Sequence, residues 1–200
     1  MVTSSHARVP WNTIVKALAV LSRPPPPKSL FRAESGVLAF YGTRTTRALL
    51  SDLQVSQTLL DEPGSAHVHR GFHRLYQSIE RDMFEDYHAP ALLCGYSLGS
   101  SLAMLHALAC CRRGVDPPAH VVLIAPPKTG DRNFTELYDE RFAERTISFA
   151  NRLDLVCSMP FGASYVHAGG IVQLSFRSRF FNHDYKGYRK AIEEWHNDES

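Results

Sequence analysis

The chain has 200 residues, of which 44% are hydrophobic and 21% are charged, and its formal net charge at pH 7 is +2. This composition is that of one globular domain and excludes a disordered chain. The small net charge gives no general electrostatic reason for nucleic-acid binding, and no apolar stretch approaches the roughly 18 residues that a membrane-spanning helix requires.

The first 33 residues are basic, because they contain five lysines and arginines and no acidic residue. Apolar residues at helical spacing predict a short helix that docks on the core through one face, formed by Ile14, Ala17, Leu18 and Leu21. Pro24–Pro27 end this helix and form a stiff connector rather than a ligand for an SH3-type partner. A transit-type presequence or a patch for anionic membranes is the alternative interpretation, whereas a signal peptide is not expected, because a clear basic n-region and cleavage site are missing.

Beyond the connector, short apolar runs alternate with amphipathic segments. The runs predict buried strands over residues 36–42, 66–72, 91–96, 120–125, 146–151 and 170–176. Helical spacing predicts helices over residues 72–87, 97–113, 132–145 and 185–195, the third of them capped by Asp131. No repeat or domain break follows Pro27, so we divide the chain into a basic helix and connector over residues 1–30 and a single domain over residues 31–200.

The alternation of strands and helices predicts parallel β-α-β units, and hence a mostly parallel central sheet with helices on both faces. Active sites in such sheets lie at the carboxyl ends of the strands. Residues that directly follow a predicted strand are therefore the candidates for chemistry.

The cysteines do not have the spacing of a disulfide framework. Cys94 lies in an apolar run, and Cys110 and Cys111 are adjacent, which suits neither a simple bridge nor a metal site. We expect these residues and Cys157 to be free thiols, which favours a reducing compartment and a cytoplasmic protein.

Ser97 lies in the sequence CGYSLGSSLA, residues 94–103, between Gly95 and Gly99. The five-residue G-x-S-x-G pattern is weak alone, but here a buried strand precedes the serine and a helix follows it, which is the context of a nucleophile elbow. Glycines on both sides remove side chains that would collide on so tight a turn, and the helix N-terminus directs N–H groups at developing negative charge. A serine that only caps a helix would not need both glycines, so we predict a nucleophile.

An elbow serine needs a base and an orienting acid, in the chain order Ser, Asp, His. Asp154 directly follows the predicted strand 146–151. His183 lies in a polar loop after the last strand and is the predicted base. His167 is the alternative, but it precedes a Gly-Gly turn and a strand, which favours a structural role.

We expect no metal and no organic cofactor. His67 and His69 lie two residues apart on one face of a predicted strand, a spacing that a metal ion can use. No third ligand has a suitable spacing, and serine-based acyl transfer needs no cofactor.

Taken in order, several segments resemble the class 3 lipases, the α/β-hydrolase family that includes fungal triacylglycerol lipases and their plant relatives. The resemblance covers residues 36 to about 195 through VLAFYGT, HVHRGFHRLY, GYSLGSSLA, APPKTGDRNF, NRLDLVCSMPF, YVHAGG and NHDYKGY. Four positions depart from the family pattern: Tyr41 replaces an arginine, Tyr96 the usual elbow histidine, Ser100 the second elbow glycine, and Leu49 a tryptophan common in the lid. The changes at Tyr41 and in the lid leave substrate preference and interfacial activation open.

The resemblance implies an α/β-hydrolase fold, with Ser97 as nucleophile, His183 as general base and acid, and Asp154 as the orienting carboxylate. It places the oxyanion hole at the backbone N–H groups of Thr43 and Leu98. It also places the lid at residues 44–53 and an acyl-chain pocket among Leu49, Leu50, Leu53, Met159 and Phe161.

The expected function is that of a serine carboxylic-ester hydrolase that cleaves acylglycerols or phospholipids through an acyl-enzyme on Ser97. A catalytically silent binding or regulatory module and an acyltransferase that uses the same serine are the alternatives. The expected partner is a lipid ester, with transient contact to a membrane or lipid-droplet surface and no nucleic acid. The sequence leaves the oligomeric state and the head group open.

Overall fold

The computed structural model describes residues 9–26, 29–42, 56–61, 65–86, 90–178 and 182–199. Its centre is a six-stranded sheet of order β1-β2-β5-β6-β7-β8. The strands are β1 Phe31–Glu34, β2 Val37–Phe40, β5 Leu92–Tyr96, β6 His120–Ile124, β7 Thr146–Asn151 and β8 Ile171–Leu174. All neighbouring pairs are parallel except β1 and β2, which confirms the predicted mostly parallel sheet.

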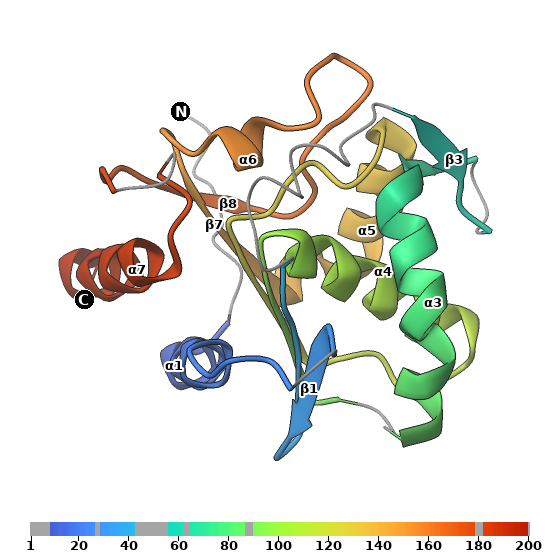
Figure 1. Ribbon diagram of the computed structural model, residues 1–200, viewed down its shortest axis with the longest axis horizontal. Coiled ribbons are helices and arrows are strands. Elements are labelled where there is room, and N and C mark those ends of the chain that lie inside the picture. Colours follow the sequence, from blue (N-terminus) through green and yellow to red (C-terminus); the bar gives the residue numbers. More distant parts are fainter. Residues whose placement is uncertain are drawn as a thin grey trace.

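Helices cover both faces of this sheet (Figure 1). On one side lie α3 Arg70–Asp86, α4 Leu98–Arg112 and α5 Arg132–Phe142, which the short 3-10 helix η1 Ala143–Arg145 follows. On the other side lie α1 Trp11–Leu21 and α7 Tyr185–Glu199. The short helix α6 Leu155–Ser158 follows β7. The arrangement is the α/β-hydrolase fold that the sequence predicts.

The strands divide their side chains between two cores because successive residues of a strand point to opposite faces. In β5, Leu93 packs into the core beneath α3, α4 and α5, whereas Leu92 and Cys94 pack into the core beneath α1 and α7. Both faces of β5 are therefore buried, which explains why its sequence is a continuous apolar run instead of an alternating one.

Three short elements were not predicted: β1, α6 and the strand β3 Gln57–Leu59, which belongs to a second sheet. The first is β1, whose residues are only partly buried because it is the edge strand of the sheet. It pairs with β2 through a tight turn in which Ser35 and Gly36 both have positive φ, 48° and 78°. Such a turn is typical of two-residue hairpins. The second is α6, a single turn that begins directly after Asp154.

A small second sheet pairs β3 Gln57–Leu59 with β4 His67–His69 in antiparallel orientation. The strand predicted over residues 66–72 is therefore shorter and lies outside the central sheet, and α3 begins at Arg70 instead of Phe72. Asp131 caps α5 as predicted, because its side chain accepts a hydrogen bond from the backbone N–H of Phe134.

The cysteines Cys94, Cys110, Cys111 and Cys157 are all free thiols. No helix among the described residues combines the length and the apolar character needed to cross a membrane.

Candidate active site

Ser97 lies on a sharp turn between β5 and α4, with φ 58° and ψ −129°. A Cβ atom on Gly95 would lie 2.3 Å from the carbonyl oxygen of Gly99, and one on Gly99 would lie 2.2 Å from the carbonyl oxygen of Phe40. Only glycine fits at either position without moving the backbone. The geometry is that of a nucleophile elbow, and a positive φ at a non-glycine residue is the strained backbone that such a turn requires.

The structure brings Ser97, His183 and Asp154 into one hydrogen-bonded line. The Ser97 hydroxyl donates to His183 Nε2 over 2.8 Å, and His183 Nδ1 donates to Asp154 Oδ2 over 2.7 Å. All three residues are buried. Ser97 follows the carboxyl end of β5, Asp154 that of β7 and His183 that of β8. His183 is thus the histidine that contacts the serine.

His167, the alternative base, lies elsewhere in the network. Its Nε2 is 2.7 Å from the backbone carbonyl oxygen of Cys157. Burial lowers the pKa of the His167 imidazole, so the ring is a neutral donor to that carbonyl. This contact ties the segment around His167 to α6, so the role of His167 is structural.

Asp154 is held by two donors besides His183. Its Oδ1 accepts from the backbone N–H of Val156 over 2.9 Å, which caps α6. Its Oδ2 also accepts from the hydroxyl of Tyr188 on α7 over 2.7 Å, and that hydroxyl accepts from the backbone N–H of Asn151 at the end of β7. Burial raises the pKa of the Tyr188 phenol, so the group stays protonated and donates.

Sequence reasoning did not single out Tyr188. The chain predicts a helix over residues 185–195, but the apolar spacing of that helix does not show which tyrosine faces Asp154. The only signal is the residue type: a tyrosine buried in a core usually has a polar partner for its hydroxyl.

Ser100 departs from the family pattern, and its side chain links the first turn of α4 to two strands of the central sheet. Its hydroxyl lies 2.9 Å from the carbonyl oxygen of Gly95 and 3.0 Å from that of Ile124, so it donates to these acceptors. The residue is fully buried. The hydroxyl therefore ties the first turn of α4 to β5 and β6, directly below Ser97.

The oxyanion side of the site is described in part. Leu98 is the first residue of α4, so its backbone N–H has no intrahelical acceptor. Gly42 lies against Ser97, since a Cβ there would lie 3.1 Å from the Ser97 Cβ. The chain directly before Thr43 thus runs beside the serine. Thr43 itself lies outside the described residues.

The predicted acyl-chain residues are described only at two positions, because Leu49, Leu50 and Leu53 and the predicted lid over residues 44–53 lie outside the described residues. Met159 is partly buried and packs against the core beneath α3, α4 and α5. Phe161 is 60% exposed, so the described part of the chain does not enclose its ring. Leu153 and Leu155, on either side of Asp154, are also exposed.

The two histidines with metal-like spacing have other contacts. His67 pairs with Asp131, with 3.2 Å between Nδ1 and Oδ2. His69 is buried, and its Nδ1 accepts from the backbone N–H of Phe72. Within the described ranges, no three His, Cys, Asp or Glu side chains form a group able to hold a metal ion.

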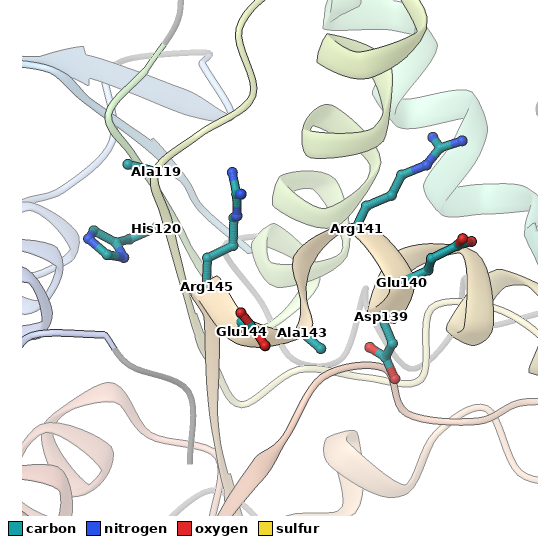
Figure 2. A pocket seen from close by; sticks show the side chains of 8 residues that line it. All are labelled: Ala119, His120, Asp139, Glu140, Arg141, Ala143, Glu144 and Arg145. Atoms are coloured by element: carbon teal, nitrogen blue, oxygen red, sulfur yellow. The ribbon is translucent and has the colours of Figure 1, made fainter. Parts of the chain in front are cut away.

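A cavity of about 830 Å³ lies away from Ser97 (Figure 2). His120 and Arg145 line it, at the amino ends of β6 and β7, together with the charged residues Asp139, Glu140 and Glu144 of α5 and η1. The amino and carboxyl ends of parallel strands lie at opposite edges of a sheet. The cavity is therefore remote from the serine, and its charged lining does not suit an acyl chain.

An α/β-hydrolase fold with a serine elbow and a histidine–aspartate pair beside it defines the class of serine hydrolases. Within that class, the model of the family "Lipase (class 3)" matches residues 37–163. The chain belongs to the class 3 lipase family.

Solved structures support the fold. The lipase from Rhizopus microsporus var. chinensis is 21% identical with a TM-score of 0.61, covering 74% of this chain and 56% of that one. The Rhizomucor miehei triacylglyceride lipase is 20% identical with a TM-score of 0.61, covering 72% and 60%. Among sequence relatives, toxin TseL of Vibrio cholerae serotype O1 is 28% identical over 145 residues, which are 66% of this chain and 22% of the toxin. The chain thus spans less than two thirds of the length of the toxin and of each of the two lipases.

Proposed function

We propose that this protein hydrolyses carboxylic esters of lipids, acylglycerols or phospholipids, through an acyl-enzyme on Ser97. The observation that carries the proposal is the hydrogen-bonded line from the elbow serine through His183 to Asp154, at the carboxyl edge of the sheet. The nucleophile is within hydrogen-bond distance of the base, and the base is within hydrogen-bond distance of the orienting acid, as in the triad of serine hydrolases.

The geometry supports the following steps. Ser97 Oγ attacks the ester carbonyl while His183 Nε2 takes its proton, and Asp154 stabilises the imidazolium that forms. The backbone N–H groups of Leu98 and Thr43 would bind the oxyanion, each worth about 3 kcal/mol. The intermediate collapses as His183 returns the proton to the leaving alcohol. Water then attacks the acyl-enzyme while His183 takes its proton. As the bond between the acyl carbon and Ser97 Oγ breaks, His183 returns the proton to Ser97 Oγ, and the fatty acid is released.

A lipid ester is the substrate class that membership in the class 3 lipase family supports. The neighbour from Rhizomucor miehei is named a triacylglyceride lipase. The exposed apolar side chains of Leu153, Leu155 and Phe161 lie in the segment that carries Asp154. They would place apolar surface beside the entrance to the site, where an acyl chain or a lipid surface approaches.

Labelling with a fluorophosphonate tests the proposal most directly. The wild-type protein should be labelled at Ser97 and should hydrolyse p-nitrophenyl esters, diacylglycerol or phosphatidylcholine, and Ser97→Ala should lose both properties. The matched control is Ser101→Ala, because Ser101 is equally buried in α4 but its hydroxyl contacts Thr129. Absence of Ser97-dependent turnover and labelling would leave the silent binding module as the better interpretation.

The choice of base is tested separately. His183→Ala should lower kcat by about 10⁴-fold or more, the scale seen when a member of such a triad is removed. His167→Ala should keep kcat within about tenfold, because its ring contacts a backbone carbonyl of α6 and not Ser97. A nearly normal His183→Ala enzyme would refute the assignment.

A further inference from the structure

Tyr96 is the last residue of β5 and directly precedes Ser97. Its ring is stacked on the imidazole of His183, with 5.2 Å between ring centroids and 20° between planes. Its hydroxyl donates to the backbone carbonyl oxygen of His183 over 3.1 Å. One side chain therefore contacts both the ring and the backbone of the histidine. Burial raises the pKa of the Tyr96 phenol, which keeps the hydroxyl a donor.

Neighbouring aromatic side chains hold the Tyr96 ring in this orientation. The edge of Tyr185 meets it at a centroid distance of 5.4 Å and an angle of 81°, and Tyr188 meets it at 6.4 Å and 72°. Tyr185 is itself fixed, because its hydroxyl donates to the carbonyl oxygen of Leu18 in α1. The orientation of the Tyr96 ring is thus supported by α7 and, through Tyr185, by α1.

In the proposed reaction, the stacking of Tyr96 on His183 affects the protonated form of the imidazole. His183 becomes an imidazolium each time it takes a proton from Ser97 or from water. The face of an aromatic ring attracts a cation within about 6 Å of its centroid, and the attraction is stronger where water is excluded. A stacked tyrosine therefore favours the charged form of His183, which exists in the transition state and not in the resting enzyme.

We propose that Tyr96 is a positioning residue for the reaction: its ring stabilises the His183 imidazolium, and its hydroxyl ties the His183 backbone so that Nε2 stays at Ser97. The inference rests on the proposed function, because it needs His183 to carry a proton during turnover. It also accounts for the departure of Tyr96 from the elbow histidine usual in the family.

Two variants separate the ring from the hydroxyl. Tyr96→Leu removes both, so kcat should fall about 3- to 30-fold, KM should change little, and the acid limb of the pH profile of kcat/KM should move to lower pH. Tyr96→Phe keeps the ring, so the acid limb should stay in place while kcat falls no more than about tenfold. Tyr138→Phe is the control, because it removes a buried hydrogen-bonded hydroxyl from α5, and it should not move the acid limb.

A measurement on the imidazole itself keeps the test independent of turnover. With isotope-labelled histidine, the His183 ring resonances are followed by NMR as a function of pH. In Tyr96→Leu they should lose the upfield displacement caused by the stacked ring and should titrate at lower pH than in the wild type. Tyr96→Phe should retain both properties and serves as the folded reference if the leucine variant is unstable.

The outcomes are distinguishable. The other ionisable groups around the Tyr96 and His183 rings are Asp154, Cys157, Asp184, Tyr185 and Tyr188. They are unchanged in these variants, so a displaced titration reports the loss of the Tyr96 ring. A displaced titration without Ser97-dependent turnover would refute the proposed function alone. Normal turnover with the same titration in all variants would overturn the role of Tyr96.

Discussion

The carboxylate of Asp154 receives donors from three parts of the chain: the loop before α7, α7 itself and the first turn of α6. A buried carboxylate is expensive unless it is hydrogen-bonded, so these donors are needed for the fold as well as for the orientation of His183. The Tyr188 hydroxyl is the donor that links the site to the helix layer formed by α1 and α7.

We predict that Tyr188→Phe lowers kcat by about tenfold and the free energy of unfolding by about 1 to 3 kcal/mol. The reason is that Asp154 loses a donor and the Asn151 N–H loses its acceptor. Steady-state kinetics and urea unfolding measure the two effects. Tyr165→Phe is the matched control, since Tyr165 is also buried but its hydroxyl has no hydrogen-bond partner among the described residues, and the change should be nearly neutral. Equal effects of the two substitutions would contradict this account.

At the scale of elements, α4 is buried on almost every side because it lies between the sheet and α3. A helix buried all round needs apolar or small residues around its whole circumference, and residues 98–110 provide them at every position except His106. Its first turn approaches β2 so closely that the backbone of Phe40 occupies the space of a side chain on Gly99.

The close approach leads to a prediction for Gly99→Ala. The added methyl group would overlap the Phe40 carbonyl at 2.2 Å, and backbone cannot move aside as a flexible side chain does. We expect a loss of about 3 kcal/mol or more in the free energy of unfolding, together with loss of labelling at Ser97, because the elbow moves with the helix. Gly170→Ala should cost little in stability, since a Cβ there meets no atom of the described residues within 4 Å. Wild-type stability in Gly99→Ala would contradict the packing described.

The interface of α3 and α4 contains a histidine unrelated to the site. His106 is buried, and its Nδ1 accepts from the hydroxyl of Tyr76 over 3.1 Å. Burial, assisted by the positive charge of Arg113, lowers the pKa of His106 to about 3. In the unfolded chain the pKa of a histidine is about 6.5, so between these values the unfolded state binds more protons than the folded state.

His106 should therefore make stability depend on pH. Above about pH 6.5 the titration of His106 does not change the free energy of unfolding. As the pH falls toward 3, His106 should lower the free energy of unfolding by up to about 1.4 kcal/mol per pH unit. His106→Gln keeps an acceptor for Tyr76 and cannot titrate, so its stability should fall less steeply with acid. Urea unfolding of both proteins between pH 7 and 4.5 measures the difference. Parallel curves would show that His106 is not buried as a neutral ring.

At the scale of the whole molecule, α1 is part of the layer that covers one face of the sheet, where it packs on β2 and β5. Its last turn also receives hydroxyl groups from two tyrosines near the site: Tyr41 donates to Val20 and Tyr185 donates to Leu18. Tyr41, one of the departures from the family pattern, is thus directed toward α1. We propose that α1 folds as part of the same domain as the central sheet.

This proposal predicts that removal of residues 1–26 prevents folding. The deletion discards the buried apolar side chains of α1, namely Ile14, Leu18, Val20 and Leu21, which together contribute more than about 5 kcal/mol. That loss is comparable with the whole stability of a typical domain. The shortened chain should aggregate or unfold without a cooperative thermal transition.

A matched pair of substitutions tests the same point without changing chain length. Leu18→Asp places a charge in the buried face of α1, whereas Val15→Asp places it on the exposed face, where the side chain is 44% exposed. The first should unfold the protein and the second should leave thermal unfolding nearly unchanged. A folded Leu18→Asp protein would show that α1 is dispensable.

The elements with a local signal can be predicted from the residue pattern alone. The apolar runs of β5, β6 and β7 and the helical spacing of α4 and α5 identify a parallel sheet with crossover helices, because backbone periodicity and burial on both faces leave a direct trace in the residue pattern. The elbow is also local, since Gly95 and Gly99 are required by contacts within one turn. The half-exposed edge strand β1 and the short α6 leave too weak a pattern to be identified.

The contacts between residues across the site, in contrast, depend on the folded arrangement of distant segments. Ser97 and His183 are separated by 86 positions and Asp154 and His183 by 29, and their contact depends on the order of strands in the sheet. Chain order and loop position favoured His183, but its contact with Ser97, the donation by Tyr188 and the stacking of Tyr96 depend on how α7 packs. A sequence specifies such contacts only through the folded core, because side-chain direction is set by packing and not by position along the chain.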